Sequence, residues 1–92
     1  MKSINFSAQF MGGTFGFFTI QILHNGIVTA SFVLSGSSDS NQQLAPGLYL
    51  ITVQGAVPPG GATFTIGQAT TPPTPEQYAG GPIYKNYVLQ ID

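Results

Sequence analysis

The chain has 92 residues, no cysteine, and only two basic and three acidic residues, which leave a net charge of −1. This length fits one small domain, and the missing cysteines exclude disulfide bridges and thiolate metal sites. Without a basic stripe or a polybasic segment, neither nucleic-acid binding nor attachment to a charged membrane surface is expected.

The N-terminal segment MKSINFSAQFMGG is not predicted to be an export signal. It has one lysine, and polar residues interrupt its apolar runs, so no h-region of a signal peptide is predicted. No run approaches the roughly 18 apolar residues of a membrane-spanning helix. From composition we expect an extracellular, surface-associated or virion-associated protein without a recognisable signal peptide and without membrane insertion.

The first predicted strand, INFSAQF at 4–10, alternates apolar and polar residues with a period of two. This is the pattern of a strand with one buried face. The residues that would share that face are Ile4, Phe6, Ala8 and Phe10. The GGTFG segment at 12–16 then predicts a bend or a bulge.

A hairpin is predicted next, because Asn25-Gly26 separates FTIQILH at 18–24 from IVTASFVL at 27–34 and both turn residues tolerate positive φ. The residues expected on its buried face are Phe18, Ile20, Ile22, Val28, Ala30, Phe32 and Leu34. Phe17 falls on the opposite face, near Phe15. Two apolar faces on one hairpin predict either burial between sheets or a subunit interface.

The polar segment SGSSDSNQQ at 35–43 predicts a flexible loop. It offers one acid, too few for a calcium cage, and no Lys or Arg for a phosphate. The next strand, LYLITVQ at 48–54, is apolar on both faces. The face expected to point into the core holds Tyr49, Ile51 and Val53, and the other holds Leu48, Leu50 and Thr52. We expect a neighbouring subunit to cover that second face.

A VPPGG turn leads to a short strand, ATFTIGQ, in which Phe64 and Ile66 point together. The Pro-rich segment GQATTPPTPEQYAGGP at 67–82 predicts an extended arm. The last ten residues again alternate, with Tyr87, Leu89 and Ile91 on one face. The predicted organisation is therefore a β-sandwich core at 1–66, an arm at 67–82, and a C-terminal strand at 83–92. That strand either pairs in its own sheet or adds to the edge of a neighbour.

About six strands at regular spacing predict an all-β, single-domain antiparallel β-sandwich of Ig-like or jelly-roll type. The stretch LAPGLYLITV resembles the L-x-P-G-x-Y-x-I-x-V turn and strand of transthyretin-like and carboxypeptidase-regulatory-like modules. The matching residues are Leu44, Pro46, Gly47, Tyr49, Ile51 and Val53. The resemblance implies a sandwich fold and carries no catalytic residue. The composition also resembles small jelly-roll subunits of spore appendages or virion shells and fibres, although those appendage subunits use cysteine cross-links.

Few residues could carry chemistry. His24 is the one histidine and is interpreted as a polar residue at a hairpin end. The three acids, Asp39, Glu76 and Asp92, are far apart in the sequence and are interpreted as solvated charges. No cofactor, metal site or catalytic residue is predicted, and an enzyme is not expected.

The leading hypothesis is a non-catalytic structural protein, a self-assembling subunit of an extracellular filament, fibre or shell, joined to other copies by strand addition and apolar interfaces. The interface candidates are Ile4, Phe6, Phe15, Phe17, Tyr84, Tyr87, Leu89 and Ile91. The alternative is a small β-sandwich module that binds a carbohydrate or a protein, which is suggested by the aromatic residues and by the tyrosines near the C-terminus.

Overall fold

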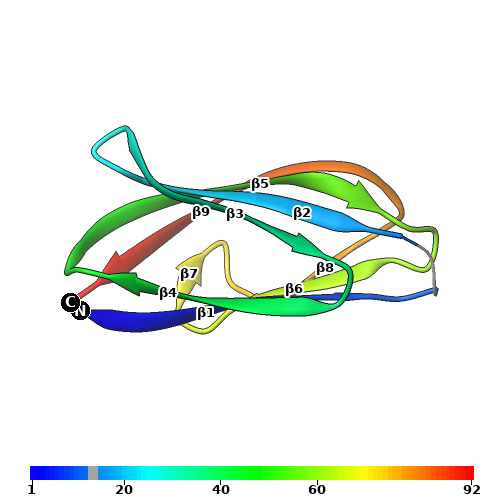
Figure 1. Cartoon of the computed structure of the whole chain (residues 1–92), viewed down its shortest axis with the longest axis horizontal. Coiled ribbons are helices and arrows are strands. Elements are labelled where there is room, and N and C mark those ends of the chain that lie inside the picture. Colours follow the sequence, from blue (N-terminus) through cyan, green and yellow to red (C-terminus); the bar gives the residue numbers. More distant parts are fainter. Residues whose placement is uncertain (13–14) are drawn as a thin grey trace.

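The computed structural model describes residues 1–12 and 15–92. Over these residues the chain forms nine strands and no helix. The strands build two antiparallel sheets that pack face to face, and both chain ends lie at the same end of the sandwich (Figure 1). The predicted all-β antiparallel sandwich is therefore confirmed.

The four-stranded sheet has the order β4-β1-β6-β8, and the five-stranded sheet has the order β3-β2-β5-β9-β7. The strands are β1 (Lys2–Phe10), β2 (Phe17–His24), β3 (Ile27–Ser35), β4 (Ser38–Leu44), β5 (Gly47–Val57), β6 (Ala62–Ile66), β7 (Thr70–Thr71), β8 (Glu76–Tyr78) and β9 (Gly81–Ile91). The bend predicted at 12–16 includes residues 13 and 14, which lie outside the described residues.

The core lies between the two sheets and contains the inward faces that alternation predicts. The predicted inward residues that are buried are Ile4, Phe6, Ala8, Phe18, Ile20, Ile22, Leu34, Tyr49, Ile51, Val53, Phe64, Ile66, Tyr87, Leu89 and Ile91. Phe18 is at the centre of an aromatic group, with ring centroids 4.9 Å from Phe10, 5.6 Å from Phe64 and 5.9 Å from Tyr78. Aromatic packing across the sheets thus joins β1, β2, β6 and β8.

The Asn25-Gly26 hairpin forms as predicted, with φ of 54° at Asn25 and 77° at Gly26. A β-bulge follows, because the register of β2 with β3 shifts between Ile22 and Leu23. The Thr29 hydroxyl donates to the Ile22 carbonyl oxygen at 3.0 Å and stabilises this bulge. The shift places Val28 opposite Leu23, on the outward face, which corrects its predicted inward position.

The turn before β5 is held by Tyr49, whose hydroxyl donates to the Ala45 carbonyl oxygen at 2.7 Å. A similar contact, in which a tyrosine hydroxyl bonds to the backbone a few residues upstream, occurs in Ig-type sandwiches. Pro46-Gly47 has the residue types that a type II turn favours at its two central positions, and such a turn is expected here. The structure differs, because φ of Gly47 is 153° and type II requires about 80° at that position. The resemblance to transthyretin-like modules stays a prediction.

Two segments contain strands that the alternation of the sequence does not reveal. The expected polar loop at 35–43 is wrong from Ser38 onward, since β4 pairs along most of β1. The extended segment expected at 67–82 contains two short strands: β7 pairs with β9 in the five-stranded sheet, and β8 pairs with β6 in the four-stranded sheet. The C-terminal strand β9 lies in its own sheet, between β5 and β7.

We predict that Phe18→Ala lowers the free energy of unfolding by about 3–5 kcal/mol, because it removes a fully buried ring and leaves a cavity in the aromatic group. Chemical denaturation followed by circular dichroism measures this change. Phe15→Ala is the matched control, since Phe15 is 76% exposed and should cost under about 0.5 kcal/mol. Equal decreases in the free energy of unfolding of the two variants would contradict the placement of Phe18 in the core and of Phe15 at the surface.

Candidate functional site

The eight predicted interface residues fall into two groups. Five of them are buried in the core of the chain itself, each with at most 1% of its surface exposed: Ile4, Phe6, Tyr87, Leu89 and Ile91. In the folded chain they therefore form no exposed surface, and their role in an interface stays a prediction. Phe15 and Tyr84 are 76% and 63% exposed, and Phe17 is half-buried with its ring 6.0 Å from that of Phe15.

A continuous row of apolar side chains crosses the outward face of the five-stranded sheet. Its members are register neighbours on β3, β2, β5 and β9, and we call them the outer apolar row: Val28, Leu23, Leu50 and Val88. Leu50 is 39% exposed and Val88 is 42% exposed. Leu48 lies beside the row and is 57% exposed. The second face of β5, expected to be covered, is therefore not covered by any described part of this chain.

The outer apolar row borders a shallow depression of about 270 Å³. The side chains that line it are almost all apolar: Leu23, Leu48, Leu50 and Val88, next to Asn25, Gly26 and Tyr49. Among the described residues, none of the outward-facing side chains of β2, β3, β5 and β9 is charged. This face offers shape and apolar contact, with no fixed charge to select a charged ligand.

The outward face of the four-stranded sheet is chemically different. Its side chains are mainly hydroxyls and amides, with the carboxylate of Asp39 among them, and they line a groove of about 460 Å³ over β1, β4 and β6. The Asn5 amide donates to the Asp39 carboxylate at 2.8 Å and to the Asn41 side-chain oxygen at 3.0 Å. No aromatic ring lines this groove within the described residues. The polar groups are thus well hydrated or bonded to one another, and no stacking platform accompanies them.

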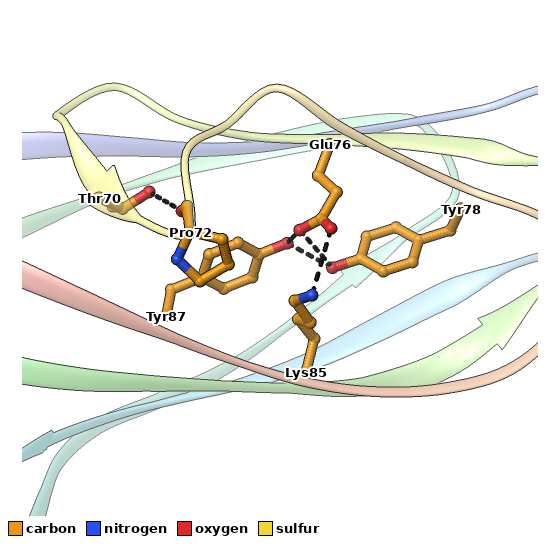
Figure 2. A network of polar contacts seen from close by, with 6 residues as sticks. All are labelled: Thr70, Pro72, Glu76, Tyr78, Lys85 and Tyr87. Carbon is orange, nitrogen blue, oxygen red and sulfur yellow. Dashed lines mark hydrogen bonds and ion pairs between the residues drawn. The ribbon is translucent and has the colours of Figure 1, made fainter.

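A polar network joins the two sheets on the side of β8 and β9 (Figure 2). The Tyr87 hydroxyl donates to Glu76 Oε1 at 2.5 Å, and Lys85 Nζ lies 3.3 Å from Glu76 Oε2. The Tyr78 hydroxyl bonds to the Tyr87 hydroxyl and lies 3.4 Å from the same carboxylate. Glu76 is therefore a structural acceptor that ties β8 to β9, which corrects its interpretation as a solvated charge.

The pKa values of this network follow from burial and hydrogen bonding. Burial raises the pKa of the Glu76 carboxyl, but the hydrogen bonds from Tyr87 and Lys85 and the charge of Lys85 together lower it below 4.5. Burial and the neighbouring carboxylate raise the pKa of Tyr78 to about 12. Burial, with the bond to Glu76, also raises the pKa of Tyr87. A carboxylate with a lowered pKa that accepts hydrogen bonds from protonated phenols is a poor general base near neutral pH.

The remaining titratable residues are placed apart from one another. The His24 ring packs on Tyr49, with centroids 4.9 Å apart, at one end of the five-stranded sheet. Asp39 lies on β4 and Glu76 on β8, the opposite edges of the four-stranded sheet, and three strand spacings make roughly 14 Å. Within residues 1–12 and 15–92, no group of three His, Cys, Asp or Glu side chains could hold a metal ion. The same residues contain no helix able to span a membrane.

The sequence did not predict the outer apolar row as one continuous surface, and it did not predict the Glu76 network. Alternation predicted the outward side of β5, including Leu50, but the row needs the register of four strands. The bulge that turns Val28 outward leaves no clear signal in the sequence. The network needs β8, a three-residue strand inside a Pro-rich segment. No protein-family model, curated protein or solved structure matches the chain.

We predict that acid weakens the fold through Glu76. The carboxyl has a depressed pKa in the folded chain, so its contribution is present above pH 4.5 and is lost as the pH falls through the folded pKa. Glu76→Gln should lower the free energy of unfolding near neutral pH by about 1 kcal/mol and flatten its decline in acid. Denaturant-induced unfolding curves at several pH values measure the free energy of unfolding of both proteins. Asp92→Asn is the charge-matched control, and an unchanged acid profile in Glu76→Gln would refute the assignment.

Proposed function

We propose that this chain is a structural subunit that associates with other copies of itself, and that the outer apolar row is one of its contact surfaces. The observation that carries the proposal is the continuity of the row across four strands without a charged neighbour. Contiguous exposed apolar surface on a small domain usually marks an interaction site. A filament, fibre or shell on a cell or virion surface is the setting we infer for such a subunit.

A second copy is the occupant that the chemistry of this face favours. Two sheets pack face to face about 10 Å apart when apolar side chains on both faces interdigitate. The face supplies such side chains from each copy, and about 25 cal/mol is gained for each Å² of apolar surface that leaves water. With a net charge of −1 on the whole chain, copies repel each other only weakly.

The alternative of a carbohydrate-binding module is less well supported. Sugar sites often combine exposed aromatic rings with hydroxyl and amide groups. Here the polar groove lies on the outward face of the four-stranded sheet, whereas exposed Tyr84 lies in β9 of the five-stranded sheet. Because the polar groove and the exposed Tyr84 ring lie on different sheets, they do not form one sugar-binding site.

We predict that Leu50→Lys weakens self-association by roughly a hundredfold or more, since a buried unpaired charge costs several kcal/mol. Leu50 is 39% exposed, so the lysine can reach solvent in the monomer and leave the fold intact. Sedimentation velocity over a range of concentrations measures the association, with electron microscopy of the same samples. The monomer has a mass of 9.7 kDa.

Gln9→Lys is the matched control for this prediction. It makes the same change in charge at an exposed position on the outward face of the other sheet. Association that is lost equally in both variants would point to net charge rather than to the outer apolar row. A wild-type chain that stays monomeric at every concentration would overturn the proposed function.

A further inference from the structure

The two sides of the sandwich differ in how their strand edges end. On one side the edges are β7 and β8, which are two and three residues long and lie in a segment with three prolines, together with the part of β9 at 81–87 that β7 does not cover. That part of β9 contains Pro82 and Lys85, and the Glu76 network ties β8 to it. Short strands, prolines and charges are the usual protection against pairing with another chain. On the other side the edge of the five-stranded sheet is β3, nine residues without a charge, a proline or a glycine. This edge has none of those protections.

The hydrogen-bonding direction of β3 follows from one contact at its end. The Gly36 N–H donates to the Gly16 carbonyl oxygen at 2.9 Å. Antiparallel pairs alternate between bonded and non-bonded residues, so Leu34 and Phe32 bond to β2 as Gly36 does. The alternate residues of β3 therefore direct their N–H and C=O groups away from β2, toward the open edge. These residues are Ser31, Val33 and Ser35. The bulge near Thr29 breaks this alternation and limits the regular edge to the second half of β3.

We propose that β3 pairs with β3 of a second copy, antiparallel, about a two-fold axis through Val33. In this register Val33 lies opposite Val33 of the partner subunit, and Ser31 lies opposite Ser35 of the partner subunit. Each of these pairs exchanges two hydrogen bonds, so every outward N–H and C=O of the three residues is satisfied. The five-stranded sheets of two copies then continue into each other.

The side chains favour the same register. Val33 is 57% exposed on the outward face, and a β-branched residue opposite its own copy is a favourable cross-strand pair. On the inward face, half-buried Phe32 would lie opposite Leu34 of the partner subunit, which extends the core across the junction. A second copy is the occupant we infer because this row of donors and acceptors is its own complement, and no charge on β3 opposes the pairing.

This inference rests on the proposed self-association and adds a second contact to it. A two-fold contact at the β3 edge differs from a contact through the outer apolar row. A subunit with two such separate contacts can link more than two copies, and the relative geometry of the two contacts decides whether the assembly closes or stays open.

The absence of cysteine makes the register directly testable by cross-linking. Paired residues that exchange hydrogen bonds have Cα atoms about 5.5 Å apart, within the range of a disulfide. Mild oxidation of Val33→Cys should therefore give a covalent dimer on a non-reducing gel. Ser31→Cys alone should give none, because its two copies lie roughly 13 Å apart across the axis. The double variant Ser31→Cys/Ser35→Cys should cross-link again.

Three outcomes separate the two proposals. The β3 contact is supported if Val33→Cys still cross-links when Leu50→Lys is added to it. It is also supported if Val33→Lys weakens dimerisation about tenfold relative to the wild-type chain. If the wild-type chain associates but Val33→Cys forms no more dimer than the surface variant Gln9→Cys, the β3 contact is overturned and the proposed function stands. If the wild-type chain is monomeric at every concentration, both are overturned.

Discussion

A two-layer sandwich can bury only the inward face of each sheet, and this geometric limit governs the molecule. The four-stranded sheet obeys it with an outward face of hydroxyls and amides, such as Asn5 and Thr63. The five-stranded sheet does not, because Leu50 and Val88 point outward after the core has been filled. Adding a layer is the physical way to remove such a face from water. The described residues form no third layer over this face, and the proposed association with a second copy would supply one.

The same reasoning applies to the strand edges. A sheet that is not closed into a barrel has two edges, and each leaves backbone groups without partners. The Pro-rich segment that follows β6 closes one side, with Thr74 bonded to the backbone of Ile66 and Glu76 bonded to Tyr87. The other side ends in β3 and β4, which the described chain leaves open. The described chain is therefore protected against pairing on one side only, so a further strand could add only at the other side.

Much of the fold could be predicted from the sequence because period-two alternation reports directly on burial. That signal placed the inward residues of the long strands, and Asn25-Gly26 placed the hairpin. It failed at β4, whose inward positions are Ser38, Ser40 and Gln42, because this edge strand is held mainly by backbone bonds to β1. It also failed at β7 and β8, which are too short to show a period. The candidate surface depends on register between strands distant in sequence, which a single sequence does not encode locally.

Low charge and missing cysteine also bear on stability. A chain of this size buries roughly 60–65% of the surface of its unfolded form, so its own core supplies a small margin. Disulfides, the usual reinforcement of small domains, cannot form here. Binding of the folded state to further copies stabilises it by mass action, because the unfolded chain does not take part. Association through the outward face of the five-stranded sheet would therefore stabilise the subunit as well as build the assembly. A surface with so few charges is unfavourable for a solitary soluble domain, but it suits the proposed subunit, which would fold and assemble together.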